Sequence, residues 1–86
     1  MGLDKKQLRE VIGKPVVTKE GKRLGLVKDI TFETRTGELI QLLLKDQTVY
    51  TKNLNLEMNH DKESIIPYNS IIAVADFVVV SEEDLI

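Results

Sequence analysis

Side chains able to catalyse a reaction or bind a metal are few in this sequence of 86 residues, and they lie far apart. His60 is the only histidine and there is no cysteine, so a zinc site would lack its usual nitrogen and sulfur ligands. His60 stands in a polar turn at residues 59–62, where we expect it to be solvated instead of oriented for a catalytic triad. The sequence therefore predicts no catalytic residue, no metal ligand and no cofactor-binding residue.

Two aspartates, Asp29 and Asp76, stand beside strongly apolar segments. Each could belong to a perturbed carboxylate pair suited to acid–base chemistry. The alternative is structural, because an aspartate at a bend can accept hydrogen bonds from backbone N–H groups that the bend leaves open. We favour the structural role for both.

Residues 21–25, Gly-Lys-Arg-Leu-Gly, combine glycine with positive charge, as phosphate-binding loops do. A Walker-type loop, however, ends in Gly-Lys-Ser/Thr and is followed by a helix. Here Gly25 is followed by an expected strand. We interpret Gly21 as a turn glycine and Gly25 as a strand glycine that lets another backbone approach closely.

The charge of the chain is unevenly distributed. The net charge is −2, yet residues 1–28 hold eight of the twelve basic residues and three of the fourteen acidic ones. This asymmetry could steer an anionic partner to one end, although the acidic balance argues against general nucleic-acid binding. No apolar run approaches a membrane span, and the N-terminus lacks the apolar core of a signal peptide. We expect one cytoplasmic domain that does not insert into a membrane.

Alternation of apolar and polar residues predicts three strands in the first half, at residues 15–18, 23–33 and 38–45. Glycine turns join them, with Gly21 in the first turn and Gly37 closing the second. Because Lys28 interrupts the apolar side of the long strand, we expect a bend or bulge near Lys28 and Asp29. A weak apolar stripe over residues 3–12 suggests one or two helical turns before Gly13 and Pro15 end them.

The second half predicts further short strands separated by polar segments. Residues 46–53 are expected to be a loop, residues 54–58 a short strand, and residues 64–67 a returning strand that ends at Pro67. Residues 68–70 form a tight corner, and residues 71–75 and 77–80 are two last strands or one strand bent at Asp76. About five or six strands with little helix indicate a mainly β fold, and we expect a small antiparallel β-barrel.

An apolar surplus on both faces of the strands predicts a surface for a partner. The segment 39–44 carries apolar residues on either face, as does the segment 71–80, so burial against another subunit would stabilise a small domain. We therefore expect a homodimer, or another protein partner, that uses Leu39, Gln41, Leu43, Ile72, Val74 and Val78. On this interpretation Leu43→Asp should break the dimer.

The ordered motifs resemble those of the PRC-barrel domain family. The elements that carry the resemblance are Gly21 to Asp29, which fits G-x-x-x-G-x-V-x-D, then Ile66-Pro67-Tyr68-Asn69-Ser70-Ile71, and then residues 73–80, AVADFVVV, with Ala75 in the usual glycine position. The resemblance implies a lead-in at residues 1–7, a PRC-barrel domain at 8–81 and an acidic tail at 82–86. Within the family, the sequence resembles the stand-alone archaeal-type proteins.

The resemblance also implies what the protein does. Members of this family are binding domains, so we expect a non-enzymatic adaptor, in a role such as archaeal-type cell division. The alternative is an RNA- or ribosome-associated factor, by analogy with a ribosome maturation factor that contains this domain. The acidic tail could dock on a partner or on the protein's own barrel, or it could be a frayed terminus.

Overall fold

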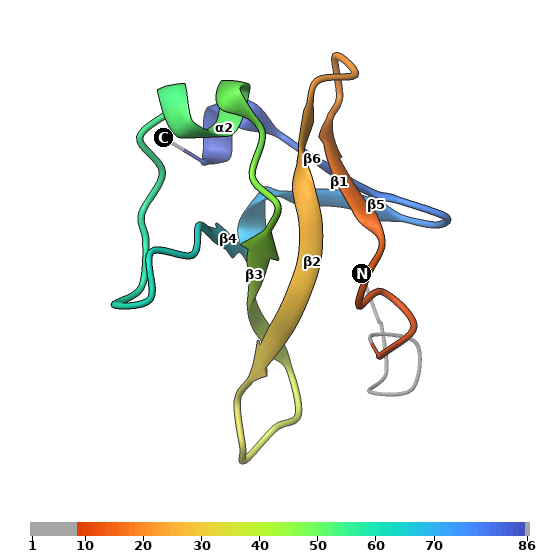
Figure 1. The fold of residues 1–86 in the computed structure, drawn as a ribbon. Coiled ribbons are helices and arrows are strands. Elements are labelled where there is room, and N and C mark those ends of the chain that lie inside the picture. The colour runs from red at the N-terminus through yellow and green to blue at the C-terminus, as the bar shows by residue number, and fades with distance from the viewer. Residues whose placement is uncertain (1–8, 86) are drawn as a thin grey trace.

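The computed structural model describes residues 9–85, which form one curved sheet with little helix (Figure 1). The first three strands are β1 (Pro15–Thr18), β2 (Arg23–Phe32) and β3 (Leu39–Lys45), and the last three are β4 (Ile65–Pro67), β5 (Ile71–Val74) and β6 (Val78–Val80). Between them lie a helix, α2 (Val49–Asn53), and two 3₁₀ turns, η1 (Tyr68–Ser70) and η2 (Glu82–Asp84). The mainly β class predicted from the sequence is confirmed.

The strand order β4-β3-β2-β1-β6-β5 departs from the expected antiparallel barrel in two ways. Strands β1 and β6 pair in parallel. The chain crosses from β4, at one end of the strand order, to β5 at the other end, and β6 then lies beside β1. The other neighbouring strands pair antiparallel. The parallel pair makes the sheet mixed. In addition, the end strands β4 and β5 are not paired with each other, so the sheet is not closed.

A short connection nevertheless forces the sheet to curl. Strands β4 and β5 stand at opposite ends of the strand order, yet only η1 separates Pro67 from Ile71. Four Cα–Cα steps reach at most about 15 Å, whereas the edge strands of a flat six-stranded sheet would lie roughly 24 Å apart. The two edges must therefore approach one another where β4 meets β5, as Figure 1 shows.

Extra residues on one strand of a pair bend the sheet at several points. Lys28 is the extra residue where Val27 pairs with Leu44 and Asp29 with Leu43. This shift lies where the sequence predicted a bulge, and it turns Lys28 out of the apolar side of β2.

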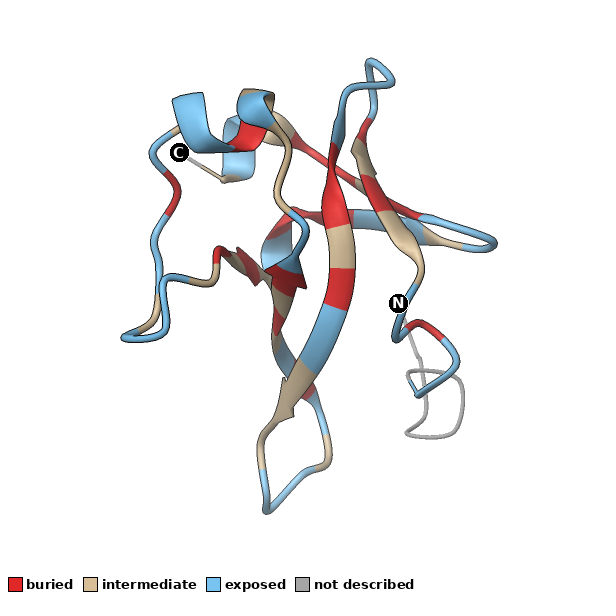
Figure 2. Ribbon diagram, viewed as in Figure 1, coloured by how far each residue is buried: buried red, intermediate tan, exposed pale blue. Residues whose placement is uncertain are grey.

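The core lies inside this curve and is built almost entirely of aliphatic residues (Figure 2). Alternate residues of β1 and β6 point inward, so Val16, Val78 and Val80 are fully buried. The remaining buried apolar residues come from the other strands and connections: Val11, Leu24, Val27, Leu39, Leu42, Leu44, Leu56, Ile66 and Ile71.

Residues 46–53 form a helix in part, instead of the expected loop. Thr48 caps α2, since its side chain accepts a hydrogen bond from the backbone N–H of Thr51. Two threonine hydroxyls then fix the helix on β2: that of Thr51 donates to the Leu24 carbonyl at 2.6 Å, and that of Thr48 donates to the Arg23 carbonyl at 2.7 Å. Leu24 is the extra residue where β2 pairs with β1. The hydroxyl of Thr51 therefore gives the Leu24 carbonyl a hydrogen-bond donor at the point where the β1–β2 register shifts.

Two other expected elements differ from the structure or fall outside it. The strand expected at residues 54–58 is reduced to one isolated bridge between Met58 and Ser64, because Asn55 has a positive φ of 54° that interrupts an extended chain. The helical stripe expected over residues 3–12, and the lead-in at residues 1–7, lie mostly or wholly outside the described residues.

The last described residues pack on the domain itself. The backbone N–H of Ser81 donates to the Ser70 carbonyl at 2.7 Å, and Leu85 packs against the core. The hydroxyl of Tyr50 donates to the carboxylate of Glu82, which joins η2 to α2. The acidic tail up to residue 85 is thus docked on its own domain.

The first prediction concerns Gly25, whose missing side chain allows β3 to approach. A Cβ at Gly25 would lie 2.8 Å from the Lys45 carbonyl oxygen, whereas one at Gly21 would meet nothing within 4 Å. Gly25→Ala should lower the free energy of unfolding by about 1–3 kcal/mol, because a backbone atom must move. Urea denaturation checks it, with Gly21→Ala as the control for positive φ. Equal losses in the two variants would contradict the close-approach role.

Candidate protein-binding surface

Strand register places an apolar patch on the outside of the sheet. Val17 of β1 lies beside Val79 of β6, and Val79 lies beside Ala73 of β5. Their neighbours along each strand, such as Val16 and Val78, point into the core, so these three side chains point outward. They form the first of two rows that run across the strands.

The second row lies two residues away along the strands. Pro15 pairs with Leu26 of β2, and Phe77 lies opposite Pro15 if the Val16–Val78 register is extended by one residue. Phe77 is 46% exposed, and Pro15 and Leu26 are half-buried. We call the two rows together the outer face; its residues are Pro15, Val17, Leu26, Ala73, Phe77 and Val79.

The outer face is unusual because solvent-facing positions of an antiparallel sheet are normally polar. The other half of the same sheet is mixed: one outward row across β2, β3 and β4 contains Thr31, Gln41 and Pro67, and the next contains Asp29, Leu43 and Ile65. None of the outer-face residues belongs to the buried core or to the partly buried residues packed against it. The outer face is therefore a second apolar layer, separate from the core.

Charged residues stand at both ends of these rows. Arg23 pairs with Val17 and ends the first row, and Lys45 pairs with Leu26 and ends the second. At the opposite end, beside Phe77, stands the exposed Asp76 in the β5–β6 turn. Within residues 9–85, none of these three residues forms an ion pair. The outer face thus has a basic border along β2 and β3 and a carboxylate at the β5–β6 turn.

The partner residues predicted from the sequence do not form one surface. Leu39 and Val78 are buried in the core, with exposures of 8% and 0%, because register shifts and the parallel pairing turn them inward. Gln41 and Leu43 lie half-buried on β3. Ile72 and Val74 lie on β5, which is at the other end of the strand order, Ile72 exposed as the extra residue opposite β6.

The residues predicted to shape turns and bends are found at such positions. Gly21 and Gly37 have positive φ in the turns after β1 and β2, and Pro67 ends β4 where η1 begins. The side chain of Asp29 accepts a hydrogen bond from the backbone N–H of Ile30 at 2.8 Å, beside the Lys28 bulge. Asp76 occupies the β5–β6 turn.

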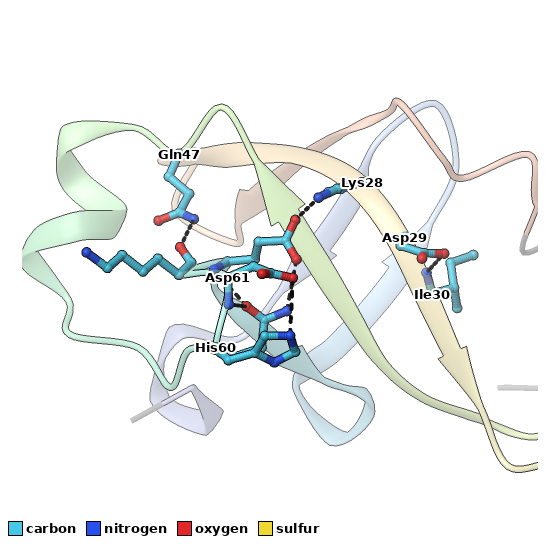
Figure 3. A network of polar contacts seen from close by, with 9 residues as sticks. Lys28, Asp29, Ile30, Gln47, His60 and Asp61 are labelled. Atoms are coloured by element: carbon cyan, nitrogen blue, oxygen red, sulfur yellow. Dashed lines mark hydrogen bonds and ion pairs between the residues drawn. The ribbon is translucent and has the colours of Figure 1, made fainter.

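A polar network ties the loop at residues 59–63 to the Lys28 bulge (Figure 3). Lys28 forms an ion pair with Glu63, whose other carboxylate oxygen accepts a hydrogen bond from the Asn59 amide at 2.8 Å. The Asn59 amide and Lys28 lower the pKa of Glu63, and Glu63 in turn raises the pKa of Lys28. His60 is exposed and lies 3.5 Å from the Asp61 carboxylate.

The polar groups of the described residues do not include a metal-binding cluster. Among residues 9–85, no three His, Cys, Asp or Glu side chains gather where they could hold a metal ion. Asp29 lies within β2, whereas Asp76 lies in the turn between β5 and β6. The network around Glu63 is therefore a clamp that holds a loop against β2.

Three of the basic residues between positions 9 and 28 contact other parts of the domain. Lys28 is held by Glu63, and the ammonium group of Lys14 donates to the Ala75 carbonyl at 3.0 Å. Lys22 lies 5.7 Å from the centre of the Tyr50 ring, a cation–π distance. The Tyr50 hydroxyl donates to Glu82, which raises the pKa of Tyr50. The three basic side chains are therefore already engaged within the domain.

Comparison with known proteins now identifies the fold family. The sequence matches the PRC-barrel domain over residues 3–85. The chain belongs to the PRC-barrel domain family. A curated relative of this PRC-barrel domain is an uncharacterized protein of Methanocaldococcus jannaschii, which is 24% identical over 83 residues. The alignment covers 96% of this chain and 89% of the relative. In the described part of this PRC-barrel domain, no helix has the length and apolar character needed to cross a membrane.

Sequence reasoning missed all six members of the outer face: Pro15, Val17, Leu26, Ala73, Phe77 and Val79. A signal for them was present, because β1 and β6 read as unbroken apolar runs in which the outward positions are as apolar as the inward ones. Which strands lie side by side, however, depends on the parallel pairing of β1 with β6. The outer face therefore depends on contacts between residues more than 60 positions apart, which the sequence does not reveal.

The second prediction concerns the stability of the Glu63 clamp at different pH values. Because the folded state lowers the pKa of Glu63, the ionised carboxylate stabilises the fold above its unfolded pKa of about 4.3. That contribution is lost as the pH falls through the lower folded pKa. Glu63→Gln should therefore be less stable than wild type at pH 7, and the gap should close by about pH 3 in urea denaturation.

The exposed carboxylate of Glu57 provides the control for the Glu63 experiment. Glu57→Gln should show a smaller loss at pH 7 than Glu63→Gln, since Glu57 forms no ion pair within the described residues. A Glu63→Gln deficit that stayed constant from pH 7 to pH 3 would refute the clamp.

Proposed function

We propose that this PRC-barrel domain is a cytoplasmic, non-enzymatic protein-binding module that binds a second copy of itself through the outer face. The observation that carries the proposal is the placement of six apolar residues at outward positions of four neighbouring strands. Burial of apolar area stabilises association by about 25 cal/mol for each Å² removed from water. An apolar patch of this kind on a small domain marks an interaction site.

The absence of a reactive centre in the described residues is consistent with this proposal but does not carry it. What favours binding is positive evidence: one half of the outside of the sheet is apolar, whereas the other half mixes polar and apolar residues. The rival RNA-associated role draws on the basic residues near the N-terminus, several of which are engaged within the domain. That role, and an adaptor role in archaeal-type cell division, stay predictions from the family resemblance.

The third prediction tests self-association and its location. Val79→Asp should convert a dimer to a monomer, because it places a carboxylate at the centre of the outer face, where association would strip it of water. Light scattering over a wide range of protein concentrations measures the change. Leu43→Asp is the matched control, since Leu43 is also a half-buried aliphatic residue at an outward strand position but lies on β3, outside the outer face.

The outcomes of this experiment are distinct. A dimer that survives Leu43→Asp and not Val79→Asp supports the proposal. A wild-type protein that stays strictly monomeric at high micromolar concentration removes self-association. Loss of the dimer in Leu43→Asp alone would move the interface to β3, which holds three of the partner residues predicted from the sequence, Leu39, Gln41 and Leu43.

A further inference from the structure

The charges around the outer face restrict how two copies can meet. Arg23 and Lys45 lie at one end of its two rows, and Asp76 lies at the other end beside Phe77. None of the three is neutralised by an ion pair within residues 9–85. The ammonium group of Lys14 is also near the β5–β6 turn, but it is held by the Ala75 carbonyl. The borders therefore differ in charge.

Two copies that pack face to face are related by a twofold axis lying between the two sheets. If the axis runs perpendicular to the strands, each basic border lies over the basic border of the other copy. Arg23 then faces Lys45 of the second copy, and like charges repel across the interface. If the axis runs along the strands, each row faces the same row reversed, and the basic border lies over the β5–β6 turn.

We propose that two copies of this domain pack through their outer faces about a twofold axis along the strands, with Lys45 of each copy paired to Asp76 of the other. The inference rests on the proposed self-association and adds its orientation. Facing sheets pack about 10 Å apart, so the apolar rows meet at the centre. The long side chain of Lys45 reaches across at the rim, where its charge stays hydrated.

The face is small, and this sets the strength of the dimer. Stable interfaces bury about 800 Å² on each partner, whereas the outer face has six apolar residues, four of them already half-buried. We therefore expect a reversible dimer whose population depends on protein concentration. In such a dimer, rim charges change the dissociation constant measurably without unfolding the protein, because all the residues involved are exposed.

The fourth prediction is a charge-reversal experiment on Lys45 and Asp76. Lys45→Glu creates two Glu–Asp contacts in its homodimer, and Asp76→Lys creates two Lys–Lys contacts. Each variant should raise the dimer dissociation constant about tenfold, as sedimentation equilibrium measures it. Mixing the two variants should restore association, because both contacts in the mixed dimer then join opposite charges. Added salt should weaken the restoration.

Lys52→Glu is the matched control for net charge, since Lys52 is an exposed lysine on α2, away from the outer face. Mixing Lys52→Glu with Asp76→Lys should not restore association. A wild-type dimer whose variants gain nothing on mixing refutes this orientation and leaves self-association standing. A wild-type monomer at high micromolar concentration refutes self-association itself, and the orientation with it.

Discussion

The short link between β4 and β5 is the constraint on which the rest of this structure depends. These strands occupy opposite ends of a six-stranded sheet, and a single 3₁₀ turn joins them. Because so few residues cannot cross the width of a flat sheet, the sheet has to wrap around its own aliphatic side chains. Ser70 and Pro67 hold this corner, where the Ser70 hydroxyl donates to the Pro67 carbonyl at 2.7 Å.

Curling also explains why the outside of the molecule is divided into unlike halves. A sheet that wraps around its core has one inner surface, which all six strands share, and an outer surface that turns in different directions. The outward positions of β3 are partly polar, and β2 adds the charged clamp between Lys28 and Glu63. The outward positions of β1, β5 and β6 are apolar. Stability of the domain and the proposed binding at its surface thus depend on opposite sides of the same strands.

Local features were largely predictable from the sequence, whereas long-range ones were not. The bulge at Lys28, the glycine turns and the corner after Pro67 each follow from a few neighbouring residues. Helix α2 was missed because its cap, Thr48, precedes only five helical residues, too few to show a helical pattern. Val78 was assigned to the surface because its register is set by β1, more than 60 residues away. Leu39 was assigned there because the register shift beside Phe32 was not visible in the sequence.

The parallel pairing of β1 with β6 has a consequence for how the protein is made. Strand β1 leaves the ribosome well before its neighbour β6, because more than 60 residues separate Val16 from its partner Val78. Until the last strand is released, one side of β1 exposes unpaired backbone groups and valine side chains to other nascent chains. Non-local pairing of this kind slows folding, so protection of the growing chain against aggregation has to last until β6 has been synthesised.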